Sequence, residues 1–497
     1  MQYRAAILKF SSLAVLALVV SGCATSAVGM SSMNGMGGMS HTSTSNAQLA
    51  DAASTATAYA APPELRSRNG KLAVTLTAAD QMVRYNGADR WAMTYNGLVT
   101  GPTLRIRPGD HLTITLINNL PEMTSLHTHG LHVNPNGNGD NPLLTIEPGQ
   151  QHTYEYEIPK TQQPGTFWYH PHAHGIVAKQ VNLGLEGAII VENDVDAALA
   201  KVSTDRVLVV TDPPLVTSDP WPDATHNAGG MGGMMGGNHD AMMMAMMGRS
   251  GPRLLANGSD GVALTGAAGK LERVHLINAT ASTRLRFTWT GTSIVKLATD
   301  GGRLPRALTV QTFDLAPGER TEVALVSNGS AGQLSAQRVS AETTNALTGS
   351  AELIATTAAD AGTDAAVLPK TLNAPLRNLF AANVKIAKTR TITLTGHMQP
   401  LIDGRPFDAT KVNFTAKKGT VEEWVIKSQS PMDHPMHLHV WPFQIKGEAG
   451  WHDIVQIPAN TTKVIRVAYD DIAGTTVIHC HILDHEDNGM MAIIKVV

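Results

Sequence analysis

The sequence predicts an all-β protein built from three copies of one β-sandwich, and three observations support this prediction. After residue 64 the chain consists of short alternating runs bounded by Gly, Pro and Asn, with few helical stretches. Three segments share a turn glycine followed by a strand-like run: RPGDHLTITLIN from Arg107, AGKLERVHLIN from Ala268 and KGTVEEWVIK from Lys418. The turns EPGQ, APGE and IPAN each precede another alternating run. Three copies of one unit account for the 497 residues, which exceed what one core usually supports.

The composition excludes some classes of function. The formal net charge is -3, and charges of both signs are interspersed without a basic stripe, so we expect no binding to nucleic acid. The chain has two cysteines, Cys23 and Cys480. Because each is predicted below to have another role, we expect no disulfide.

The N-terminus resembles an export signal. An apolar run at residues 10–20 follows two basic residues and is too short to span a bilayer as a mature helix. It ends in VSGC, which resembles a bacterial lipoprotein box, so residues 1–23 are predicted to be a signal peptide and Cys23 the lipidated residue. The protein would then be anchored in a membrane of the cell envelope, facing the periplasm, and Ala24 is compatible with the outer membrane. The alternative is an ordinary signal peptide that contains a cysteine.

Residues 24–64 are rich in Ser, Thr, Ala, Gly and Met without periodicity, and are predicted to be a flexible tether. The tether contains methionines spaced by glycine and serine at positions 30, 33, 36 and 39. Thioethers select Cu(I), although a linker without a ligand role would have the same composition. We predict sandwich domains at residues 65–200, 201–370 and 371–497.

The last domain carries the segment HCHILDHEDNGMM. In an extended strand, Cys480 points to one face while His479 and His481 point to the other, so one strand contacts two metal sites. A thiolate with two imidazoles and a distant thioether suits a blue-copper centre. Cys480, His485 and Met490 supply three of these ligands, and His434 is the candidate for the fourth.

Four His-x-His pairs are the second strong signal. They are His127-Thr-His129, His170-Pro-His172, His437-Leu-His439 and His479-Cys-His481. Because residues i and i+2 share a face of a strand, eight imidazoles from four strands could surround three metal ions. The alternative is that hydrogen bonds alone satisfy these histidines. His132, His174, His397 and His452 are predicted to lie in loops or to contact the ligands without binding metal.

The segments LHTHGLH, WYHPHAHG, HPMHLH and HCHILDHEDNGMM, in this order, resemble the copper-binding signatures of three-domain multicopper oxidases, the family of laccases and bacterial cuprous oxidases. The resemblance implies three cupredoxin-like Greek-key β-sandwiches and four copper ions, one of type 1, one of type 2 and two of type 3. It assigns His434, Cys480, His485 and axial Met490 to type 1, His127 and His437 to type 2, and His129, His170, His172, His439, His479 and His481 to type 3.

The resemblance also implies a mechanism. A substrate would give single electrons to the type 1 copper, and these would pass from the Cys480 sulfur to His479 or His481. Dioxygen would be reduced to water by four electrons at the three-copper cluster. Protons must come from nearby acids, and Asp140 and Glu486 occupy positions that resemble those of the family's proton donors.

A methionine-rich insert at residues 226–247 bears on the substrate. Its methionines are Met231, Met234, Met235, Met242, Met243, Met244, Met246 and Met247. It resembles the inserts of bacterial cuprous oxidases, so we predict a Cu(I) relay and a role in copper tolerance; a promiscuous hydrophobic surface is the alternative. In those oxidases the insert belongs to the third domain. Here it lies in the second, and the sequence leaves open whether it reaches His434 and His485.

Three other functions are alternatives to a cuprous oxidase. A broad laccase-type phenol or Mn(II) oxidase would use the methionines only to scavenge copper for its own sites. A non-enzymatic copper-binding envelope protein would not need the complete ligand set. A copper nitrite reductase would not need the HCH segment and four His-x-His pairs. We expect a monomer whose partners are dioxygen and a reductant, either Cu(I) or a phenol or another metal ion.

Overall fold

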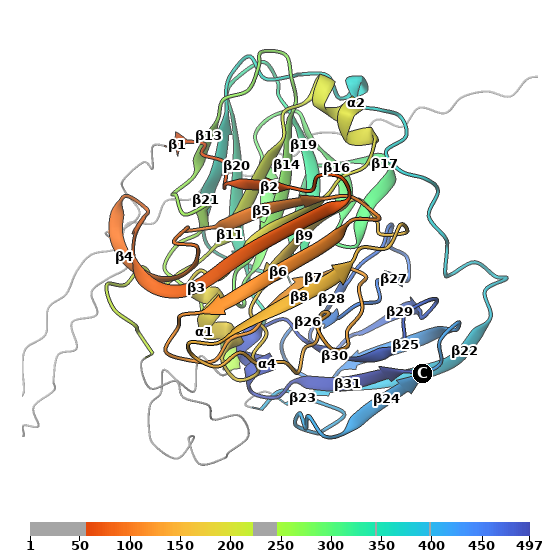
Figure 1. The fold of residues 1–497 in the computed structure, drawn as a ribbon. Coiled ribbons are helices and arrows are strands. Elements are labelled where there is room, and N and C mark those ends of the chain that lie inside the picture. The colour runs from red at the N-terminus through yellow and green to blue at the C-terminus, as the bar shows by residue number, and fades with distance from the viewer. Residues whose placement is uncertain (1–55, 222–245, 343–344, 397–398) are drawn as a thin grey trace, which may run out of the picture. The chain divides into compact units, whose positions relative to one another are not determined.

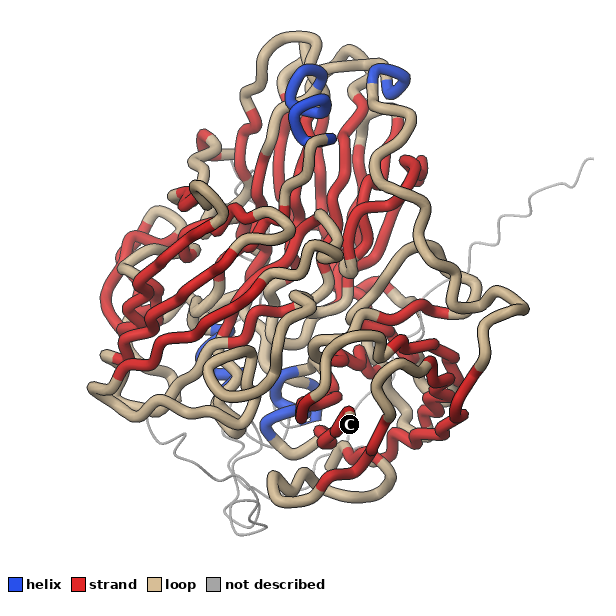
Figure 2. The backbone as a smooth tube through the Cα atoms, turned by 45° about the vertical axis from the view of Figure 1, so that its right-hand side comes forward, coloured by secondary structure: helices blue, strands red, loops and turns tan. Residues whose placement is uncertain are grey.

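The computed structural model describes residues 56–221, 246–342, 345–396 and 399–497. The predicted signal peptide, Cys23, His397, most of the tether and Met231 to Met244 of the insert lie outside the described residues. The described chain is all-β, as predicted, and its strands form six sheets (Figures 1 and 2). No helix in these ranges is both long and apolar enough to cross a bilayer.

The first two sheets come from the N-terminal third of the chain. One has the order β4 (Ala88–Tyr95), β3 (Lys71–Tyr85), β6 (His111–Asn118), β8 (Gln151–Glu157). The other has the order β2 (Glu64–Arg66), β5 (Gly101–Ile106), β10 (Gly187–Val191), β9 (Gly165–His170), β7 (His127–His129). Strand β3 alternates exposed and buried residues, and the buried residues of both sheets form one core that includes Leu76, Ile114 and Phe167. This is the burial pattern of a sandwich.

The next two sheets follow the same plan. One has the order β12 (Leu255–Ala256), β11 (Arg206–Thr211), β14 (Glu272–Asn278), β19 (Arg320–Val326), β16 (Ser293–Thr299), β17 (Gly302–Val310). The other has the order β1 (Thr57–Ala58), β13 (Val262–Leu264), β21 (Leu347–Thr357), β20 (Gly332–Val339), β15 (Arg284–Trp289), β18 (Thr312–Leu315). Their shared core includes Leu276, Phe287 and Leu325.

The last two sheets contain the C-terminal motifs. One has the order β23 (Leu401–Ile402), β22 (Ile386–Thr395), β25 (Val421–Ser428), β29 (Thr462–Ala468), β27 (Phe443–Ile445). The other has the order β24 (Val412–Ala416), β31 (Met491–Val496), β30 (Gly474–Cys480), β26 (His434–Leu438), β28 (Ile454–Ile457). The described helical segments are α1 (Val177–Asn182), α2 (Val195–Val202), the 3₁₀ turn η2 (Ala365–Val367) and α4 (Leu483–Asp487).

The three repeats recognised in the sequence occupy equivalent positions. Strands β6, β14 and β25 each lie between one parallel partner (β3, β11, β22) and one antiparallel partner (β8, β19, β29). The turn glycines that precede them, Gly109, Gly269 and Gly419, all have a positive φ, of 93°, 76° and 79°. A residue with a β-carbon adopts that conformation only at a cost, which explains the glycine in each copy.

The described chain already contains a strand before residue 64, the predicted end of the tether. Strand β1 pairs in parallel with β13, with Thr57 opposite Val262. The Tyr59 hydroxyl then accepts a hydrogen bond from the Val207 amide at 3.1 Å. Composition could not reveal this, because a strand of two residues leaves no periodicity in the sequence.

Asp212, which follows β11, gives the protein a predicted dependence of stability on pH. Burial raises the pKa of this carboxyl to about 7, from its ordinary 3.8. Because the folded state holds the proton more tightly, the contribution to stability is present at pH 4 and is lost as the pH rises to 7. The loss is about 1.4 kcal/mol per pH unit over that window. The Tm of Asp212→Asn should therefore rise relative to the Tm of the parent protein as the pH increases from 4 to 7. A difference in Tm that stays constant over this range would contradict the prediction.

Candidate metal centre

The first candidate centre surrounds the Cys480 sulfur. Strands β26 and β30 are antiparallel neighbours, with Met436 opposite Cys480, which brings His434 to the end of β30. The turn into α4 then carries His485 back, so that Cys480 Sγ lies 3.6 Å from Nδ1 of both His434 and His485. All three side chains are fully buried. Met490 is also buried, and its amide donates to the His485 carbonyl at 2.9 Å, which closes the loop.

The chemistry of this donor set fits a copper ion. Burial raises the pKa of the Cys480 thiol, and burial together with His485 lowers the pKa of His434 well below its ordinary value. A metal ion would displace the thiol proton and bring three donors together in one low-polarity site.

The second candidate centre contains the eight histidines of the His-x-His pairs. The ladders β7–β9 and β26–β30 place His127 opposite His170 and His437 opposite His479. Ring nitrogens of the two ladders meet: His127 Nε2 lies 3.4 Å from His437 Nε2, and His172 Nε2 lies 3.3 Å from His479 Nε2. In the third sandwich, His439 Nε2 lies 3.1 Å from His479 Nε2. In the first sandwich, His129 Nδ1 lies 3.3 Å from His170 Nε2.

The other ring nitrogen of most of these histidines faces a protein oxygen. His127 Nδ1 donates to Asp140 at 2.8 Å, His129 Nε2 to Asp453 at 3.0 Å, and His437 Nδ1 to the Asp453 carbonyl at 2.9 Å. His170 Nδ1 and His479 Nδ1 donate to the backbone oxygens of Pro171 and Cys480. Since an oxygen acceptor requires the proton on the nitrogen that faces it, the other ring nitrogen of each of these five histidines carries a lone pair.

Burial favours the neutral form of His127, His129 and His479. Burial, reinforced by the neighbouring rings, lowers the pKa of His127 and His129 well below its ordinary value, and burial lowers that of His479 to about 3. No described residue donates a hydrogen bond to either ring nitrogen of His481, which is also buried. The facing nitrogens of His127 and His437, 3.4 Å apart, and of His129 and His170, 3.3 Å apart, have lone pairs that repel without a proton between them, so the donor set fits metal ions placed there.

The two predicted proton donors lie beside this centre. Asp140 is buried and accepts from His127 Nδ1 and from the Thr128 amide at 2.8 Å, so it fixes the orientation of His127. Glu486 is fully buried, and burial raises the pKa of its carboxyl. Its Oε2 lies 3.0 Å from His479 Nδ1, and its Oε1 lies 3.3 Å from His172 Nε2.

Of the other histidines named above, the three that the structure describes, His132, His174 and His452, contact neither cluster through a ring nitrogen. His132 donates to the Val440 carbonyl and pairs with Asp471, while His452 pairs with Asp300. His174 packs against Phe407 with ring centroids 4.9 Å apart. Sequence reasoning missed Asp453 and Arg320, which form an ion pair against His129. Neither residue has the spacing of a metal motif.

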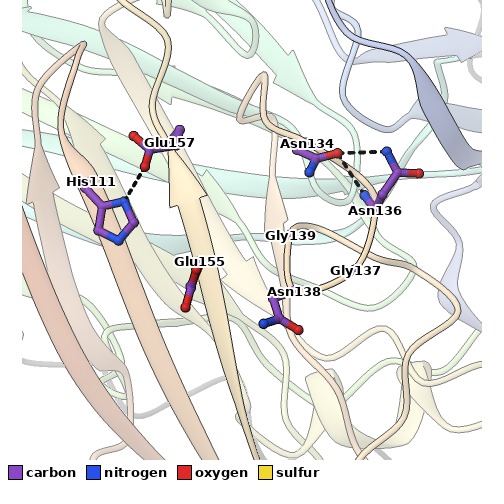
Figure 3. A pocket seen from close by; sticks show the side chains of 8 residues that line it. All are labelled: His111, Asn134, Asn136, Gly137, Asn138, Gly139, Glu155 and Glu157. Atoms are coloured by element: carbon purple, nitrogen blue, oxygen red, sulfur yellow. Dashed lines mark hydrogen bonds and ion pairs between the residues drawn. The ribbon is translucent and has the colours of Figure 1, made fainter.

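A surface cavity lies apart from both clusters (Figure 3). It has a volume of about 460 Å³, and its lining includes His111, Glu157 and the loop of residues 134–139. His111 of β6 and Glu157 of β8 form a hydrogen bond at 2.7 Å on one side of it. None of the predicted ligands lines this cavity.

The end of the methionine-rich insert reaches the Cys480 centre. His485 Nε2 donates to the backbone carbonyl of Met246 at 2.9 Å. Arg249 then pairs with Asp484 of α4 through its side chain at 2.8 Å and its amide at 2.7 Å. The insert belongs to the second sandwich in sequence, yet its last residues contact Nε2 of the His485 ring, while Nδ1 faces Cys480.

Comparison with known proteins is consistent with this geometry. Two models of the family described as multicopper oxidase match residues 77–196 and 379–497. A multicopper oxidase of Staphylococcus haemolyticus is 30% identical over 81% of this chain and 83% of its own length. The solved structure of a Campylobacter jejuni multicopper oxidase, described as a metallo-oxidase, is 25% identical with a TM-score of 0.73, covering 89% of this chain and 95% of its own. A laccase-like multicopper oxidase from Ochrobactrum, described as active on lignin model compounds, is also 25% identical with a TM-score of 0.73, covering 88% of this chain and all of its own.

Proposed function

The chain belongs to the multicopper oxidase family, and from that premise we propose that this copper-dependent, dioxygen-using oxidoreductase takes its electrons mainly from Cu(I). The observation that carries the proposal is the hydrogen bond from His485 Nε2 to the Met246 carbonyl. It places the last residues of a methionine-rich segment at the imidazole through which an electron enters the Cys480 centre.

We propose the copper ligands as the motifs assign them. His434, Cys480, His485 and Met490 would hold the type 1 ion, and His127 and His437 the type 2 ion. The type 3 pair would lie between His129, His170 and His481 on one side and His172, His439 and His479 on the other. The copper ions supply the one-electron and dioxygen chemistry, while the protein supplies neutral imidazoles in fixed tautomers.

Glu486 and Asp140 are the proposed sources of protons. Glu486 lies within 3.3 Å of ring nitrogens of His172 and His479, where an acid could deliver a proton to the cluster that these histidines line. Asp140 lies beside other histidines, 2.8 Å from His127 Nδ1 and 3.7 Å from His439 Nδ1. The two acids therefore contact different members of the eight-histidine cluster.

The second sandwich covers the Cys480 centre from two directions, which favours a small substrate. Met246 and Arg249 cover His485 and α4, while the Ala341 carbonyl accepts from the Asp433 amide, next to His434. A bulky phenol would have to displace Met246 to reach Nε2 of His485. Cu(I) needs less space than a phenol, and the soft thioethers of the methionines would bind it on its way to His485.

The setting we propose is the cell envelope. An exported lipoprotein anchored through Cys23 would hold the oxidase in the periplasm, where conversion of Cu(I) to Cu(II) would serve copper tolerance. Laccase-like oxidation of phenols is the second candidate, which the likeness to the Ochrobactrum protein favours.

Replacing the eight methionines of residues 231–247 by leucine tests the proposed substrate. Leucine keeps the size and apolar character of methionine but removes the sulfur. We expect the KM for Cu(I) to rise several-fold and the KM for a dimethoxyphenol to stay unchanged, in oxygen-consumption assays. The matched control replaces Met30, Met33, Met36 and Met39 of the tether. Equal effects on both substrates would refute the relay.

A further inference from the structure

Arg320 uses every one of its hydrogen-bond donors next to the eight-histidine cluster. It is fully buried at the start of β19 in the second sandwich. Its Nη1 and Nη2 bind the two oxygens of Asp453 at 2.7 and 2.5 Å. The remaining donors reach the backbone oxygens of Gly318, Asp300 and Thr166 at 3.2, 2.6 and 3.3 Å. One side chain thus links strands from all three sandwiches.

Asp453 passes this restraint to the histidines. Its Oδ1 accepts from His129 Nε2 at 3.0 Å, and its backbone carbonyl accepts from His437 Nδ1 at 2.9 Å. Burial alone would raise the pKa of Asp453, but the Arg320 charge outweighs burial and holds the pKa below its ordinary value. A proton on His129 Nε2 leaves Nδ1 as the nitrogen that faces His170.

His129 therefore differs from its neighbour His127. His127 donates from Nδ1 and presents Nε2, whereas His129 donates from Nε2 and presents Nδ1. The two rings belong to one three-residue strand, so the backbone alone does not select opposite tautomers. The tautomers are selected by the two carboxylates that accept from these rings, Asp140 for His127 and Asp453 for His129.

Two glycines show how closely the second sandwich fits this site. Gly130, after His129, has φ of 89°, and a β-carbon there would overlap the Arg320 guanidinium and lie 2.5 Å from Asp453 Oδ2. A β-carbon at Gly318, two residues before Arg320, would lie 2.7 Å from the His481 ring. The second sandwich supplies no predicted copper ligand, yet its turn at residues 316–320 forms a wall of the cluster.

We propose that Arg320 is a positioning residue for the copper cluster: through Asp453 it holds His129 in the tautomer and rotation that present Nδ1 to the metal. The inference rests on the proposed role of His129 as a copper ligand. The side chain of Arg320 binds no copper and no substrate in this account. Arg320 affects the copper affinity of the cluster and the coupling between its ions. Loss of a residue that orients a metal ligand weakens metal binding about 10- to 100-fold.

The test compares Arg320→Lys with Arg303→Lys. Arg303 is the matched control, because it is also a fully buried arginine of the second sandwich with two acidic partners, Asp196 and Glu322, but touches none of the eight histidines. Lysine keeps the charge and loses the two-pronged contact. The readouts are copper per chain after reconstitution, the blue absorption, the near-ultraviolet absorption of the coupled copper pair, and the Tm of the metal-free protein.

We expect Arg320→Lys to keep the blue absorption and to lose the near-ultraviolet absorption together with part of its copper. Arg303→Lys should lower the Tm of the metal-free protein and keep both absorptions. A full copper content with an unchanged near-ultraviolet band in Arg320→Lys would overturn the proposal, as would an equal loss in Arg303→Lys. If Arg320→Lys does not fold, Asp453→Asn serves as the same test with the same expected and opposing results.

His129→Gln separates this inference from the ligand assignment. If His129→Gln keeps the near-ultraviolet band, the assignment of His129 as a ligand is wrong. If His129→Gln loses the band while Arg320→Lys keeps it, the ligand assignment stands and only the positioning role fails.

Discussion

Cys480→Ser is expected to abolish both the blue colour and all oxidase activity. The colour of such a centre comes from charge transfer between thiolate and copper, and a serine hydroxyl offers neither the soft donor nor that transition. Cys480 is also the residue between His479 and His481, so it joins the two candidate centres through the shortest covalent path. Absorption spectra and oxygen uptake with any reductant measure the two effects.

Met436→Leu is the matched control for this substitution. Met436 is fully buried and lies opposite Cys480 in the β26–β30 ladder, so the exchange perturbs the same core with little change in volume. The control should stay blue and active. Oxidase activity in Cys480→Ser at more than a trace level would mean that electrons reach the histidine cluster by another route.

Glu486→Gln is expected to lower kcat about 100-fold or more, for Cu(I) and for a phenol alike, because a positioned general acid contributes roughly 10²- to 10⁴-fold. Glutamine keeps the shape of the side chain, fully buried against His172 and His479, but cannot deliver a proton. Reduction of the blue centre by substrate should stay fast, so the blue colour should bleach during turnover.

Glu486→Asp provides the rescue for that experiment. A shorter acid still carries a proton, so it should recover part of the kcat that glutamine loses. If glutamine and aspartate reduce kcat equally, or if glutamine leaves kcat unchanged, Glu486 holds the site together without supplying protons.

The fold could be predicted, and the copper ligands proposed, because their signals are local in sequence. The turn glycines before β6, β14 and β25 and the His-x-His pairs follow from backbone geometry over a few residues. The alternation of His479, Cys480 and His481 on one strand identifies two centres at once. Such patterns can be recognised in a sequence without knowledge of the packing.

The remaining features depend on contacts between distant segments. Arg320 and Asp453 are 133 residues apart in sequence, and Arg249 and Asp484 are 235 apart. Neither pair has a spacing that periodicity could detect, and a buried ion pair looks like any surface pair in a sequence. The contact of the insert with His485 follows from the second of these pairs. For the same reason, the opposite tautomers of His127 and His129 could not be predicted.

The central claim is that Cu(I) is the preferred electron donor of this oxidase. The most direct measurement is oxygen consumption by the copper-loaded full-length protein with Cu(I), a dimethoxyphenol and Mn(II) in parallel at matched concentrations. The account predicts the highest kcat/KM for Cu(I) and a selective loss of that activity when residues 231–247 are removed. A higher kcat/KM for the phenol or Mn(II), unchanged by the deletion, would show a broader laccase-type oxidase instead.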